Sequence, residues 1–133
     1  MVEPQQSLHF TRKFITDEAK RLYNGLTNGN YLPQNTVYSH FLYVFGVTAI
    51  SDKEKPLKPL VWQPSVGLLA YMIDTLFSDT DNKNHWEITV RCFQWHDKEP
   101  NKNTMKNTVS NYKQGYKEMP KGHENLDTIL REM

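Results

Sequence analysis

The stretch PSVGLLAYMIDTLF, residues 64–77, places the strongest constraint on how this chain folds. It opens with a proline near a helix start, where the missing N–H group has no partner to lose. It then carries apolar side chains on nearly every side of the helix. Such a helix is stable only when other elements cover it, so we predict that residues 64–77 form the central helix.

A first covering helix is predicted within residues 14–33. Thr16 is a candidate cap, and acidic residues follow it, as suits the positive end of a helix. Leu22 and Leu26 belong to an apolar stripe at helical spacing, and Gly29 ends the pattern.

The second predicted helix is aromatic and has no charged residue. Asn35 or Thr36 precedes it, and Gly46 is the predicted stop. Together with the first helix it would form a helical hairpin over about residues 14–46. A helix that is apolar around most of its circumference either lies in the centre of a fold or meets a partner.

Residues 47–63 read as a connector. Pro56 and Pro59 prevent a long helix there, and residues 60–62 are expected to form one short extended piece.

Residues 86–95 fit two structures. Ile88 and Val90 alternate with polar neighbours as in a strand, whereas Glu87 precedes Arg91 by the four residues that favour an ion pair on a helix. We favour the helix.

The C-terminal stretch, residues 120–133, has an apolar stripe that includes Leu126 and Ile129 and predicts a last helix. A chain of 133 residues with 38% hydrophobic residues can build one core. We therefore predict one all-α domain, 1–133, a compact bundle of about five or six helices. Its helical C-terminal part, about 64–133, would be helix-turn-helix-like.

Composition limits the classes of protein that this chain can belong to. The net charge is +1, so any electrostatic attraction to nucleic acid has to be local. The single cysteine, Cys92, cannot form an internal disulfide, which fits a reducing compartment. No apolar run is long enough to cross a membrane, and the N-terminus lacks the layout of a signal peptide. We expect a cytoplasmic protein without membrane contact.

Positive charge is concentrated between residues 98 and 117. This segment has five lysines and one acid, Glu99, and so carries +4, whereas the whole chain carries +1. On a helical wheel Lys102, Lys106 and Lys113 share one flank, beside an apolar stripe.

These are the residue types of a helix that reads DNA. Lysines neutralise phosphates, and Asn, Gln and Ser side chains can contact base edges in a major groove. The preceding helix, a turn that contains Pro100, and this helix would form a helix-turn-helix-like unit. The alternative is an ordinary solvated helix face. The candidate contacts to double-stranded DNA are Lys98, Lys102, Asn103, Lys106, Asn107, Ser110, Lys113 and Lys117.

Catalytic and metal chemistry have weaker support in the sequence. His85, Cys92 and His96 would stack on one helical face as zinc ligands can, but a structural zinc site usually has four ligands. As a nucleophile Cys92 would need an oriented base and some positive field, and His85 and His96 have no carboxylate partner evident in the sequence beyond Asp97. We expect no enzyme activity, no metal and no cofactor.

The segments LVWQPSVGLLAYMIDTLF, HWEITVRCF, NTMKNTVSNYK and LDTIL follow one another over roughly residues 57–133. In this order they resemble the C-terminal part of the RteC family, helical regulators associated with bacterial conjugative transposons. The resemblance implies a non-enzymatic, helix-turn-helix-like DNA-binding or regulatory domain from a mobile genetic element. The alternative is a protein–protein interaction module that uses the aromatic second helix, through self-association or another protein partner, without binding nucleic acid.

Overall fold

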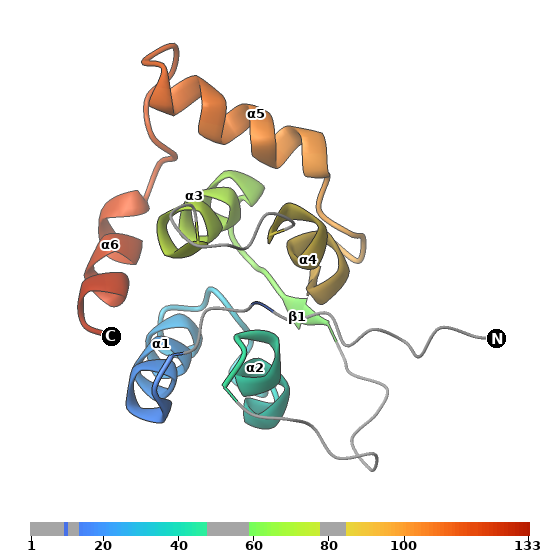
Figure 1. The fold of residues 1–133 in the computed structure, drawn as a ribbon, viewed down its shortest axis with the longest axis vertical. Coiled ribbons are helices and arrows are strands. Elements are labelled where there is room, and N and C mark those ends of the chain that lie inside the picture. The colour runs from blue at the N-terminus through green and yellow to red at the C-terminus, as the bar shows by residue number, and fades with distance from the viewer. Residues whose placement is uncertain (1–9, 11–13, 48–58, 78–84) are drawn as a thin grey trace, which may run out of the picture.

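The computed structural model describes residues 10, 14–47, 59–77 and 85–133. This part of the chain contains six helices and two very short strands (Figure 1), which confirms the predicted all-α class. Most of the predicted connector, residues 48–58, lies outside the described residues. The elements are α1 (Thr16–Asn28), α2 (Tyr38–Val44), β1 (Leu60–Val61), α3 (Val66–Phe77), α4 (His85–Cys92), β2 (Phe93–Gln94), α5 (Lys102–Lys113) and α6 (His123–Arg131).

Helix α3 is the central element, as its apolar composition predicts. It contacts α4, α5 and α6, and Figure 1 shows α5 lying across α3 and α4 on the side away from α1 and α2. Eight of its twelve residues are buried, and Asp74 is the one charged residue among them. The Ser65 hydroxyl accepts the Leu68 N–H at 3.3 Å and so helps to fix the first turn.

Helix α1 differs from prediction at its first residue. Thr16 is already helical, and the capping position belongs to Ile15, whose N–H donates to Glu18 Oε1 at 3.1 Å. The prediction that Thr16 is the cap is therefore wrong, because Thr16 is the first helical residue, and Glu18 accepts the N–H of the capping residue as the acid of a capping box does. The predicted stop is confirmed, since Gly29 closes the helix with an N–H bond to the Gly25 carbonyl at 2.9 Å.

Helix α2 was predicted to follow Asn35 or Thr36, and it begins one or two residues later, at Tyr38. Val37 holds the capping position, and the Thr36 hydroxyl donates to the Pro33 carbonyl at 2.6 Å instead of capping the helix. Gly46, with a φ of 78°, follows the last turn, as predicted. The helix packs on α1, where the Tyr23 ring lies 4.8 Å from that of Tyr38.

Aromatic rings join the N-terminal and central parts of the core. Phe10 stacks on Phe77 of α3 with ring centroids 4.0 Å apart, and Phe45 lies 5.6 Å from Phe10. Phe45 also contacts Phe41 at 4.6 Å and Phe93 at 6.5 Å. These five side chains are 0–1% exposed, so one continuous apolar cluster connects α2, α3 and β2.

The two strands form a small parallel sheet in which Leu60 pairs with Phe93 and Val61 with Gln94. The Trp62 N–H extends the pairing with a 2.8 Å bond to the Gln94 carbonyl. The predicted extended piece near residues 60–62 is thus confirmed. The favoured helix over residues 86–95 is correct only as far as Cys92. Phe93 and Gln94 are extended because their backbone pairs with β1.

Candidate nucleic-acid interface

Helix α5 has a defined cap at each end. The Asn101 side chain caps the N-terminus by accepting the Thr104 N–H at 2.9 Å. At the other end Gly115, with a φ of 79°, reverses the chain, and the Tyr116 N–H returns to the Asn111 carbonyl at 2.9 Å. The helix therefore has a defined length and direction.

The inner face of α5 holds it against the core. Met105 is 0% exposed and Val109 is 7% exposed, as the predicted apolar stripe requires. The Tyr112 hydroxyl donates to Asp74 Oδ2 at 3.2 Å, and Lys113 Nζ lies 2.9 Å from Asp74 Oδ1. Burial, followed by the nearby Asp74 carboxylate, raises the pKa of Tyr112 above its usual value. A buried acid of α3 thus anchors the C-terminal turn of α5.

The N-terminal turn of α5 has a looser anchor on α4. Lys102 Nζ lies 3.6 Å from Glu87 Oε2, and the same carboxylate lies 3.3 Å from the Arg91 Nε. All three side chains are largely exposed to solvent. Ion pairs of this kind contribute about 0–1 kcal/mol, so Lys102 is held only weakly.

The outward face of α5 carries the predicted polar residues. Asn103, Lys106, Asn107 and Ser110 are exposed. The Ser110 hydroxyl accepts from Gln114 Nε2 at 2.6 Å, which occupies part of its hydrogen-bonding capacity. Within the part of the chain that the structure describes, Lys106 makes no ion pair.

The two remaining candidate lysines flank the helix. Lys98 closes a tight turn between β2 and α5, where the Trp95 N–H bonds the Lys98 carbonyl at 2.7 Å. The central residues of this turn, His96 and Asp97, have φ of 52° and 63°. Lys117 follows the reversal at Gly115, and both lysines are exposed. Lys102, Lys106 and Lys113 thus lie within α5, and Lys98 and Lys117 lie just before and just after it.

Helix α2, the basis of the alternative function, contributes mainly to the core. Its residues 40–44 are buried, and Phe41 and Phe45 are 0% exposed. The exposed large apolar residue beside it is Val37, which is 40% exposed at the capping position. The rings of Phe41 and Tyr43 are thus covered by the rest of this chain, and the ring of Tyr38 is partly buried.

The candidate zinc ligands and the candidate nucleophile differ in their exposure to solvent. Cys92 is buried, and burial raises the pKa of its thiol to about 12, so thiolate is scarce at neutral pH. His96 is exposed in the turn that follows β2, whereas His85 is the first residue of α4. Across the described ranges, no three His, Cys, Asp or Glu side chains are grouped to hold a metal ion.

Sequence reasoning missed two features near this surface. Tyr116 is 74% exposed and Met119 is 49% exposed in the segment between α5 and α6, among lysines. It also missed that Asp74 organises α5, although a lone carboxylate in an otherwise apolar helix indicates a buried acid that needs a partner.

A second polar cluster joins α3 to α6. The Tyr71 hydroxyl donates to Asp127 Oδ1, while His123 Nδ1 lies 3.0 Å from Asp127 Oδ2. Burial, then the hydrogen bond to Asp127, raise the pKa of Tyr71 to about 12. Tyr71 also lies 5.8 Å from Tyr112, ring to ring, so the two polar clusters are neighbours.

No family model, curated protein or solved structure matches this chain. None of the helices in the described residues is both long enough and apolar enough to span a bilayer.

Proposed function

We propose that this chain is a non-enzymatic DNA-binding or regulatory domain in which α5 lies along double-stranded DNA. The observation that carries the proposal is the division of α5 into two faces. Met105 and Val109 hold the helix on the core, while Asn103 and Asn107 face outward with lysines beside them. A helix held along one side has the other side available to enter a groove.

The arrangement of α4, the turn and α5 agrees with this proposal. Helices α4 and α5 contact each other, and the second one is the exposed member of the pair. In helix-turn-helix proteins the second helix reads the major groove while flanking groups contact phosphates. The resemblance to RteC regulators adds an association with a mobile genetic element to the proposal.

The lysines have different expected roles. Lys98, Lys106 and Lys117 can reach phosphates without breaking an ion pair to any described residue, and Lys102 can do so by leaving an exposed partner. Lys113 is engaged by Asp74 and is the weakest candidate. Asn103, Asn107 and Ser110 are the candidate contacts to base edges.

The test is fluorescence anisotropy with a labelled mixed-sequence duplex, over a range of salt concentrations and at protein concentrations up to tens of micromolar. Each phosphate contact lowers log K by about 0.9 per unit of log salt, so three or four lysines predict a slope of roughly −3 to −4. Replacing Lys98, Lys106 and Lys117 together with alanine should flatten the slope by about 2 to 3. A matched control, Lys20→Ala with Arg21→Ala on α1, should bind as the parent does.

A second variant distinguishes contacts to base edges from contacts to phosphates. Asn107→Ala should leave the salt slope unchanged and reduce only the preference among duplex sequences, once a preferred site has been selected. Absence of binding at low salt and tens of micromolar protein, or a triple variant that binds like the parent, would show that this face is solvated surface only. The protein-interaction alternative would then have to use residues other than the covered rings of α2.

A further inference from the structure

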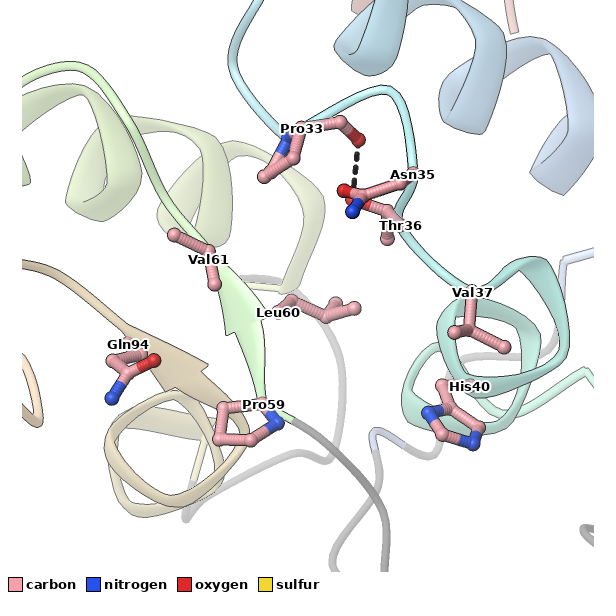
Figure 2. A pocket seen from close by; sticks show the side chains of 9 residues that line it. All are labelled: Pro33, Asn35, Thr36, Val37, His40, Pro59, Leu60, Val61 and Gln94. Carbon is pink, nitrogen blue, oxygen red and sulfur yellow. Dashed lines mark hydrogen bonds between the residues drawn. The ribbon is translucent and has the colours of Figure 1, made fainter. Parts of the chain in front are cut away.

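A pocket of about 330 Å³ lies between the start of α2 and strand β1 (Figure 2). Val37 and His40 form its α2 side, and Leu60 and Val61 form the opposite side on β1. This volume is many times the space that a single buried water molecule needs. It is at the lower end of the range of pockets that bind small molecules.

His40 is the unusual group in this pocket. The residue is 6% exposed, and its Nδ1 has no hydrogen-bond partner in the part of the chain that the structure describes. Buried polar atoms in folded proteins nearly always have a partner, so an orphaned ring nitrogen beside a cavity indicates a missing one. Nδ1 itself is shielded from solvent. A ligand would reach it after a rotation of the ring about the Cβ–Cγ bond, a torsion with a broad minimum.

The other polar groups among the described lining residues are uncharged. The amides of Asn35 and Gln94 come from opposite sides, and each offers one acceptor and two donors. Among the described lining residues there is no Asp, Glu, Lys or Arg. A charged ligand would lose its hydration there without gaining a counter-charge from any of these described residues, which is costly. Thr36 also lines the pocket, but its hydroxyl already donates to the Pro33 carbonyl (Figure 2). The remaining walls are proline, valine and leucine side chains, which suit an apolar body.

We propose that this pocket binds a small neutral molecule with an apolar body and an amide-like hydrogen-bonding group, which pairs with the imidazole of His40. The proposal does not depend on DNA binding by α5, since the two sites share no residue. Failure of either one leaves the other standing.

Three probes of similar shape test the charge requirement in the full chain. Benzamide is neutral, benzoate is an anion and benzylammonium is a cation, and each can be titrated while backbone amide signals are followed by NMR. Benzamide should shift the amide signals of Val37, Val61 and Gln94 in a saturable way, with a Kd in the millimolar range. Benzoate and benzylammonium should bind at least about tenfold more weakly, because of their desolvation cost.

Two variants locate the site and one is the control. Val61→Trp fills the pocket from its rim, where Val61 is 38% exposed and the fold has room for a larger side chain, and should weaken benzamide binding by at least about tenfold. His40→Phe keeps a ring but removes both nitrogens, and should weaken binding several-fold. Ile15→Trp, at a position 63% exposed and outside the pocket, should bind like the parent.

Saturable benzamide shifts that Val61→Trp abolishes would support the proposal. No saturable shift with any probe, equal affinity for the charged probes, or unchanged binding by Val61→Trp would each overturn it. Unchanged benzamide binding by a folded His40→Phe would overturn the assignment of the imidazole. The rim variant gives a result even if the substitution at buried His40 prevents folding.

Discussion

Helices α2 and α5 differ most in what covers them. In α2, five of seven residues are buried, whereas in α5 two of twelve are. Helix α2 is therefore a structural part of the core, and α5 is held along one edge with most of its surface in solvent.

The two helices also differ in the kind of contact that holds them. Helix α2 is surrounded by aromatic rings, among them Phe45 and Tyr23, whose packing does not depend on pH or salt. Helix α5 is held by two apolar side chains and by polar contacts to Asp74 and Glu87. Attachment along one face, as in α5, leaves the outer side chains free to contact a partner. Those side chains can be substituted without unfolding the protein.

The largest effect is expected in α2. Phe41→Ala should lower the free energy of unfolding by about 3–5 kcal/mol, because the ring is 0% exposed and its removal leaves a cavity. Urea unfolding followed by circular dichroism measures the change. Val37→Ala, at the exposed start of the same helix, is the control and should cost less than about 1 kcal/mol. Equal effects of the two changes would mean that α2 is not a core helix.

A smaller effect is expected at the anchor of α5. Asp74→Ala should cost about 1–3 kcal/mol, because it removes the acceptor of the Tyr112 hydroxyl and the partner of Lys113. Hydrogen exchange should show faster opening of α5 than of α2 in this variant. Tyr112→Phe removes one of the two bonds and should cost less than Asp74→Ala. Equally faster exchange in both helices would contradict the view that Asp74 stabilises α5 and not α2.

Sequence patterns predicted the helices whose own apolar residues determine which side is buried. The apolar run of residues 66–77 indicates a covered helix, and the stripe that contains Met105 and Val109 indicates which side of α5 faces inward. Strand β2 could not be predicted, because Phe93 and Gln94 become extended only through pairing with β1.

The candidate site was predictable in part for the same reason. Periodicity placed Asn103 and Asn107 on the outer face of α5, where they are exposed. It could not show that Lys113 meets Asp74, a partner 39 positions away in the sequence. Ion pairs between distant elements follow from the tertiary fold, which a helical wheel does not contain.

The attachment of α5 and α6 should also respond to alkaline pH. Burial and the hydrogen bond to Asp127 raise the pKa of Tyr71 to about 12, from about 10 in the unfolded chain. A group with a raised folded pKa favours folding below its unfolded pKa, and this contribution is lost as pH rises from about 10 toward 12. The urea midpoint should therefore fall over that interval.

Two phenylalanine variants test the origin of that fall. Tyr71→Phe and Tyr112→Phe each remove one of the tyrosines whose pKa is raised, and each should make the alkaline decrease shallower. Tyr116→Phe, at a position that is 74% exposed, is the control and should keep the decrease of the parent. An unchanged profile in both buried-site variants would assign the decrease to other groups.

The smallest effect on stability is expected for Lys102. Its side chain is 48% exposed and that of its partner Glu87 is 41% exposed, so Lys102→Ala should change the free energy of unfolding by less than about 0.5 kcal/mol. A double-mutant cycle with Glu87→Gln should give a coupling below about 1 kcal/mol. Lys113→Ala should cost more, about 1 kcal/mol, because the Asp74 side chain is 11% exposed and would lose its cation.

The same pair of lysines distinguishes structural from DNA-binding charge. Lys102 can exchange Glu87 for a phosphate at little cost, so Lys102→Ala should flatten the salt slope of DNA binding by about 0.9. If Lys113 left Asp74, a poorly solvated carboxylate would lose its cation. Lys113→Ala should therefore lower the free energy of unfolding and leave the salt slope of DNA binding nearly unchanged. Anisotropy and urea unfolding on the two variants measure both quantities. If Lys113→Ala flattens the slope as much as Lys102→Ala does, then Lys113 also contacts the DNA, and Asp74 is a partner that the phosphate displaces.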